Sequence, residues 1–180
     1  TIDPNGNATT YSWSLSNSNT ASLSSDTAKT PFLTGIDNAT ISVTLVATNA
    51  SGSDSTSSWV TVRNVAPTAR LANNGPTDEG NPITISMTGA KDPSQADTQA
   101  GFRYAFDCNG NSLAGATYAG SGTAASVDCT FADNGSYLVR GKIIDKNGGA
   151  TEYTTNVTVN NVAPSVNAGV DQQVREGSLV

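Results

Sequence analysis

The sequence contains no histidine, only one methionine and two cysteines, and only 13% of its 180 residues are charged. Without histidine, neither a Ser-His-Asp triad nor a Cys-His pair can be assembled. Two carboxylates that hydrolyse a glycosidic bond have to face each other across a cleft. The acidic residues here fall instead in turns between short apolar segments. The sequence therefore favours a protein that is not an enzyme.

Long hydrophobic runs and positive charge are also lacking. No run of about 18 apolar residues is present, so nothing in the sequence is predicted to span a bilayer. The formal net charge of −6 disfavours electrostatic binding to nucleic acid or to an anionic membrane. Divalent cations and cationic surfaces are better matched partners. A surface rich in Ser, Thr and Asn and poor in Lys is typical of secreted β-proteins, which predicts an extracellular or cell-surface location.

The two cysteines, Cys108 and Cys129, are 21 residues apart (129 − 108). This separation and the absence of histidine exclude a CxxC pair and a Cys/His zinc site. A disulfide between them would close a loop that stabilises the fold by roughly 3 kcal/mol, and it would place the protein in an oxidising, extracytoplasmic compartment. The alternative is two buried free thiols.

The sequence contains an internal repeat. The segment Thr61–Pro67, TVRNVAP, returns as TVNNVAP at Thr158–Pro164, a shift of 97 residues (158 − 61). The same shift carries Glu79 onto Glu176. A period of this length indicates tandem copies of one domain. We expect residues 1–63 to be the C-terminal part of one unit, residues 64–160 a complete unit, and residues 161–180 the start of a third.

Strand patterns dominate within each unit, and no stretch keeps the apolar period of a helix over three turns. Tyr11, Trp13 and Leu15 alternate with serines, and Phe102, Tyr104 and Phe106 alternate with polar or small residues in the same way. We expect the cores to form around Trp13 and Phe106. About seven short strands in just under 100 residues are typical of an immunoglobulin-like sandwich. The predicted fold class is all-β, with tandem immunoglobulin-like β-sandwiches joined by short Pro-containing linkers that proline keeps extended and semi-rigid.

Several of these segments resemble PKD-type immunoglobulin-like domains. They are the strand Tyr11-Ser-Trp13, the strand-turn-strand segment Val43–Gly52, the closing Val60-Thr-Val62 and the Asn-Val-Ala-Pro joint. The second copy departs from the family pattern, with Tyr104-Ala-Phe106-Asp-Cys108 in place of a tryptophan strand. The resemblance implies a tandem module of bacterial or archaeal cell-surface proteins, adhesins or S-layer proteins, or an accessory module of secreted hydrolases.

Oxygen-bearing side chains cluster in some of the turns. Asp3-Pro-Asn5-Gly-Asn7 places hard oxygen ligands at alternate positions, as the start of a calcium-binding loop does, but lacks its terminal Glu. Asp92 and Asp97 occupy the corresponding turn of the second copy, and Glu79 and Glu176 follow the two joints. The alternative is that Asp-Pro and Asn-Gly simply form turns. The residues predicted to bind calcium are Asp3, Asn5, Asn7, Glu79, Asp92 and Asp97.

Trp59 lies on the opposite face of its strand from Val60 and Val62, so it is expected to point outward. An outward tryptophan marks either a sugar-binding or subunit contact, or an isolated surface aromatic. Asn-X-Ser/Thr sequons, which matter only where the source glycosylates its secreted proteins, begin at Asn7, Asn38, Asn49, Asn134 and Asn156.

The function expected from these features is that of a structural or interaction segment of an extracellular stalk, adhesin, S-layer or filament. Its partners would be neighbouring repeats, copies of the same protein, or cell-surface and polysaccharide ligands. An open sheet edge in the first unit would also accept a strand from a neighbouring chain. The alternative is a ligand- or carbohydrate-binding accessory module of a secreted hydrolase, with Trp59 in its binding surface.

Overall fold

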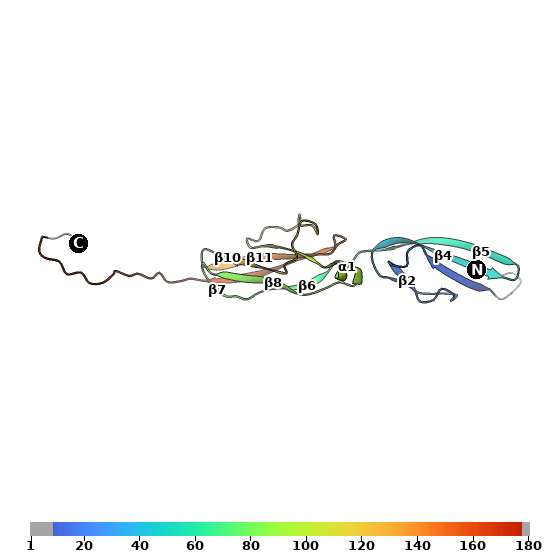
Figure 1. Cartoon of the computed structure of the whole chain (residues 1–180), viewed down its shortest axis with the longest axis horizontal. Coiled ribbons are helices and arrows are strands. Elements are labelled where there is room, and N and C mark those ends of the chain that lie inside the picture. Colours follow the sequence, from blue (N-terminus) through green and yellow to red (C-terminus); the bar gives the residue numbers. More distant parts are fainter. Residues whose placement is uncertain (1–8, 178–180) are drawn as a thin grey trace.

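The computed structural model describes residues 9–177. The strands form two groups that lie end to end, one in residues 10–62 and one in residues 68–160, and an extended tail follows (Figure 1). Residues 161–177 contain no helix or strand and are almost entirely exposed. The predicted all-β class is confirmed by the described part of the chain, in which the one helix is six residues long.

The first group has two sheets. The larger one is antiparallel in the order β1-β4-β5 and contains β1 (Thr10–Leu15), β4 (Ala39–Asn49) and β5 (Gly52–Val62). The smaller one pairs β2 (Ala21–Leu23) with β3 (Leu33–Gly35). A side chain at Gly35 would collide with Val62, so β3 lies close against the end of β5 that leads into the joint. The small sheet therefore covers only part of the large one.

This partial cover explains a difference from the expected core. The alternation of Tyr11, Trp13 and Leu15 on one face of β1 is confirmed, but these side chains are half-buried, and Trp13 does not sit at the centre of a closed core. The Trp13 indole donates to the carbonyl oxygen of Ala28 at 2.8 Å. Along β5, residues 52–59 are exposed on both faces. The fully buried apolar side chains of the first group are Ala21 and Ile41.

The second group is a sandwich of two sheets, and its seven strands match the number expected. One sheet has the order β10-β8-β6 and contains β6 (Thr68–Asn73), β8 (Pro82–Lys91) and β10 (Ser126–Thr130). The other has the order β7-β12-β11-β9 and contains β7 (Thr77–Asp78), β9 (Arg103–Asp107), β11 (Gly135–Ile144) and β12 (Ala150–Asn160). The short β7 runs parallel to β12, and the other pairings are antiparallel.

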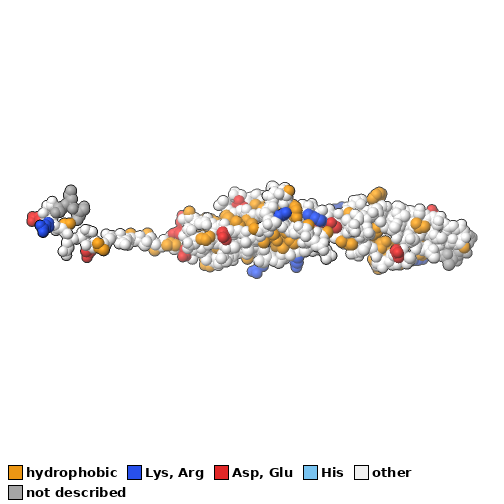
Figure 2. All heavy atoms as spheres, in the orientation of Figure 1, with side chains coloured by type: hydrophobic (Ala, Val, Ile, Leu, Met, Phe, Trp, Pro, Cys, Tyr) orange, Lys and Arg blue, Asp and Glu red, His pale blue; other side chains and the backbone are white. Residues whose placement is uncertain are grey.

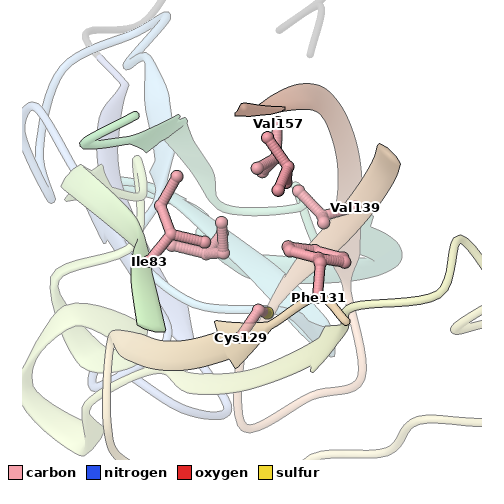
Figure 3. Packing of buried hydrophobic residues seen from close by; sticks show 7 residues of the cluster. Ile83, Cys129, Phe131, Val139 and Val157 are labelled. Carbon is pink, nitrogen blue, oxygen red and sulfur yellow. The ribbon is translucent and has the colours of Figure 1, made fainter. Parts of the chain in front are cut away.

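The core between these sheets is mainly aliphatic. Ile83 from one sheet meets Val139 and Val157 from the other, with Phe131 and Cys129 beside them (Figure 3). Burying each such aliphatic side chain stabilises the fold by about 1.5–3 kcal/mol. Phe106, expected at the centre, packs against this cluster from its margin and stays partly buried, because β9 is an edge strand.

Cys108 and Cys129 form a disulfide, as the sequence predicted. Cys108 follows β9 directly and Cys129 lies in β10, so the bond links an edge of each sheet. It also closes the long segment between these two strands, most of which has no regular structure.

The helix α1 (Gln95–Ala100) was not predicted. Ser94 caps it by accepting a hydrogen bond from the backbone N–H of Asp97 at 3.2 Å, and Gly101, with φ of 81°, ends it. A helix of six residues is too short to show an apolar periodicity in the sequence, so only its cap residues, Ser94 and Gly101, indicate it. Its importance is that it places Asp97.

Among residues 9–177, no helix has the length and apolar character needed to cross a bilayer.

Replacing both cysteines (Cys108→Ala with Cys129→Ala) is expected to lower the free energy of unfolding of the second group by roughly 3 kcal/mol, because the unfolded chain regains the freedom of the open loop. Urea denaturation followed by circular dichroism measures this change. The wild-type protein with its disulfide reduced is the matched control and should behave like the double variant. A loss below about 1 kcal/mol would contradict a stabilising role for the bond.

Candidate functional site

The joint between the two groups packs onto the hairpin turn that connects β11 to β12. The Asn64 side-chain amide donates to Asp145 Oδ2 at 2.8 Å, and the Thr151 hydroxyl donates to the carbonyl oxygen of Pro67 at 2.6 Å. A side chain at Gly149 would collide with both Asn64 and Asp145, so only glycine allows this close approach. The joint is therefore attached to the group that follows it.

Asp145 organises that turn from a fully buried position. Its Oδ1 accepts hydrogen bonds from the backbone N–H groups of Asn147, at 2.8 Å, and Gly149, at 2.9 Å. Two amides on one carboxylate oxygen hold the turn in a single shape. The same side chain thus links the turn to the joint through Asn64.

The next residue, Lys146, joins the two groups. Its Nζ lies 2.8 Å from Asp97 Oδ1 in α1 and 2.9 Å from Asp37 Oδ2 in the loop between β3 and β4. Burial works against the charge on Lys146, but the bonds to Asp97 and Asp37 outweigh it and raise its pKa. The hydrogen bond from Lys146 is also the main reason that the pKa of Asp37 is lowered. One ammonium group therefore bridges the first group to the second.

Three carboxylates converge beside this bridge. Asp92, Asp97 and Asp145 each offer an oxygen, and these oxygens all lie within 4.8 Å of one another. Asp92 Oδ1 accepts from the backbone N–H of Ser94 at 2.7 Å. Burial raises the pKa of Asp92, and the negative charges of Asp97 and Asp145 raise it further. Two buried oxygens, Asp92 Oδ2 and Asp97 Oδ2, have no hydrogen-bond partner among the described residues.

A cavity of about 130 Å³ opens beside Asp92. Both groups and the joint line it, and its polar lining includes Asp37, Asn38, Arg63, Asn64, Asp92 and Ser94. The Oδ1 atom of Asn38 is buried there and also lacks a hydrogen-bond partner among residues 9–177. The contact between the two groups at the joint is thus polar and contains a cavity, several acceptor oxygens and the ammonium group of Lys146.

The structure brings together Asp92 and Asp97 from the predicted calcium ligands and does not bring Glu79 to them. Glu79 follows β7, at the opposite end of the second group from α1 (Figure 1). There its carboxylate accepts from the backbone N–H of Val162 at 3.0 Å, beside the second joint. Asp3, Asn5 and Asn7 lie outside the described residues.

Sequence reasoning missed Asp145, Asn64 and Lys146. Asp145 opens the run Asp-Lys-Asn-Gly-Gly, which reads as an ordinary hairpin turn. Asn64 belongs to the repeated Asn-Val-Ala-Pro segment, which by itself indicates only a boundary between units. The sequence does hold two signals of a binding site. Asp145 at the start of a turn and Asn64 in a repeated joint both carry side-chain oxygens that can bind a cation. Nothing in the sequence places them side by side.

Trp59 is 70% exposed, which confirms that it points outward. It lies on β5 opposite Ser42 of β4, on a face formed mostly by hydroxyl side chains, with Val46 among them. On this face Thr44 and Ser57 are hydrogen bonded at 2.7 Å across the two strands. The arrangement is a single aromatic ring on a hydroxyl-rich sheet face.

Comparison with known proteins finds no matching family model and no matching curated protein. Among solved structures, the chain is similar to fibronectin(III)-like modules of Clostridium thermocellum CbhA, with 19% identity, a TM-score of 0.41 and coverage of 95% of this chain and 88% of that chain. It is also similar to a putative membrane-anchored protein from Corynebacterium diphtheriae, with 14% identity, a TM-score of 0.39 and coverage of 92% of this chain and 48% of that one. A third is the human Desmocollin-1 ectodomain, with 16% identity, a TM-score of 0.31 and coverage of 92% and 32%.

The chain spans less than half of the second and third of these structures. Identities of 14–19% with TM-scores of 0.31–0.41 assign neither a fold nor a function to this chain. The sheets themselves show the all-β sandwich. The resemblance to PKD-type domains stays a prediction.

Replacing Lys146 with methionine should uncouple the two groups and destabilise the second, because the fully buried Asp97 would lose its cation. Leaving a buried charge without its partner costs about 3 kcal/mol or more. Asp37→Asn should uncouple the groups with little effect on the second, since Lys146 then keeps Asp97. Lys91→Met removes an exposed ammonium group and is the control.

Tryptophan fluorescence separates these effects, because both tryptophans, Trp13 and Trp59, lie in the first group. Unfolding of the second group is followed by near-ultraviolet circular dichroism of its tyrosines. Equal stability of Lys146→Met and Lys91→Met would show that the bridge does not hold the joint.

Proposed function

We propose that this chain is a structural and interaction segment of an extracellular stalk, adhesin, S-layer or filament, in which β-sandwich units act as stiff spacers. The observation that carries the proposal is the ion-pair bridge across the joint, from Asp37 through Lys146 to Asp97. A side chain that binds both groups restricts their motion relative to each other. Such a restriction is expected in a spacer that keeps its length and is not expected in a flexible string of domains.

The units of this proposal are residues 1–63, 64–160 and 161–180. Strand pairings in the described residues run within 10–62 or within 68–160, which supports the first boundary. The β4–β5 and β11–β12 hairpins both end in an Asn-Val-Ala-Pro joint. The third unit rests on the repeat alone, since residues 161–177 have no strand. The partners of this role are neighbouring repeats or copies of the same protein.

The disulfide supports an extracellular location, because such bonds persist in oxidising compartments. The outline of the molecule also suits a spacer: Figure 2 shows the two groups as one continuous elongated body, with the tail extending from one end. The joint adds stiffness in two ways. Proline restricts the backbone at position 67, and Asn64 and Lys146 bind the elements on either side.

Small-angle X-ray scattering tests the stiffness. The wild-type protein should give one elongated particle with a sharply bounded distance distribution, whereas Asp37→Asn should give a broader distribution with a shorter mean distance between the groups. Asp26→Asn changes the same charge in the first group away from the joint and is the control. A wild-type distribution as broad as that of the variant would refute a stiff joint.

The second candidate is a carbohydrate-binding accessory module of a secreted hydrolase, and the exposed Trp59 favours it. An aromatic ring on a face of hydroxyl groups can stack on a sugar while the hydroxyls bond to it. If this is correct, Trp59→Ala should abolish retention on insoluble polysaccharide. Phe32→Ala, which removes another exposed aromatic side chain, should not. Failure of the wild-type protein to bind a panel of polysaccharides would remove this candidate.

A further inference from the structure

We propose that Asp92, Asp97 and Asp145 form a binding site for a divalent cation at the joint, and that calcium is the ion that fits it. One oxygen from each carboxylate lies within 4.8 Å of the others. The site itself stands on this geometry. Its effect on stiffness rests on the proposed function.

The first argument comes from oxygens without partners. Asp97 is fully buried, its Oδ1 is bound by Lys146, and its Oδ2 has no hydrogen-bond partner among the described residues. Asp92 Oδ2 is buried without a partner in the same way. An ionised carboxylate only accepts, and burying one unpaired is costly. A cation between these two oxygens supplies the missing interaction for both.

The second argument is the balance of charge. Asp37, Asp92, Asp97 and Asp145 carry four formal negative charges, and Lys146 carries one positive charge, which leaves −3 in a largely buried cluster. Arg63 lines the cavity but is exposed and forms no ion pair among the described residues. One divalent ion lowers the formal charge to −1. Because water is largely excluded from this cluster, a bound cation stabilises its closely spaced negative charges more than solvent does.

The third argument concerns which ion fits. The ligands are all oxygens, which select hard cations. Calcium tolerates irregular coordination by carboxylate and amide oxygens, whereas magnesium requires a near-ideal octahedron and usually keeps several waters. Three carboxylates from a turn, a helix and a hairpin, with the amides of Asn38 and Asn64 nearby, therefore suit calcium better.

The joint is placed to complete the coordination. Rotating the Asn64 amide by half a turn would direct its oxygen, in place of its nitrogen, toward Asp145 and the ion. The buried Asn38 Oδ1 comes from the first group and lines the same cavity as Asp92. Calcium accepts six to eight oxygens, so amide and water oxygens can join the three carboxylates. Calcium would thus tie the joint and α1 to the hairpin turn.

Isothermal titration of the whole chain with calcium chloride tests the site. We expect a dissociation constant of about 10⁻⁴–10⁻³ M, the range of extracellular calcium modules. The melting temperature should rise by about 5 °C in about 10 mM calcium, and by much less in magnesium at equal ionic strength. Asp97→Asn and Asp92→Asn should each weaken calcium binding at least about tenfold. Asp54→Asn, the same change on an exposed strand position far from the joint, should leave it unaltered.

The Asp92→Asn variant guards against loss of folding, because Asp92 Oδ2 has no hydrogen-bond partner among residues 9–177 and its replacement removes no hydrogen bond made by that atom. Far-ultraviolet circular dichroism without calcium checks that each variant is folded. No heat of binding and no thermal shift in the wild-type protein would overturn the proposal, and so would an affinity that survives both substitutions. Scattering with and without calcium keeps the two proposals apart. Calcium binding without stiffening supports the site and refutes its mechanical role. A stiff joint in a protein that does not bind calcium supports the spacer and refutes the site.

Discussion

The contact on which the arrangement of the two groups depends is the ammonium of Lys146 between Asp97 and Asp37. Asp97 is fully buried, so its charge has to be met by a group inside the protein rather than by water. Lys146 is able to meet it because the β11–β12 turn, shaped by Asp145, projects the residue that follows toward α1. Once there, the same ammonium reaches the first group. The cation that neutralises the buried Asp97 therefore also connects the two groups through Asp37.

The rest of the second group holds this contact in place. Its aliphatic core fixes β8 against β11 and β12, and these strands lead into the Asp92 loop and the Asp145 turn. The disulfide ties β9 to β10 at the margin. The first group contributes less, since its small sheet covers only part of the large one and its buried apolar side chains are few. Its position depends correspondingly more on the polar contacts at the joint.

Much of the fold was predictable because its causes are local. Alternation placed Tyr11, Trp13 and Leu15 on one face of a strand, and the repeat marked where the hairpins end. The core was predicted less well, since the large aromatics Trp13 and Phe106 suggested centres that isoleucine and valine occupy instead. The candidate site was found only in part. Asp92 and Asp97 are five residues apart, the first in the turn before α1 and the second in α1, but Asp37, Asn64 and Asp145 reach them through packing of distant segments across the joint, which no local pattern encodes.

The joint therefore has two properties in one place, a bridge between units and a cluster of acceptor oxygens with excess negative charge. The central claim is that it holds the units in one orientation. Residual dipolar couplings of the two groups in one aligned sample measure this directly. If the joint is stiff, a single alignment tensor will fit the couplings of residues 10–62 and of residues 68–160; separate tensors of clearly different magnitude in the wild-type protein would contradict it.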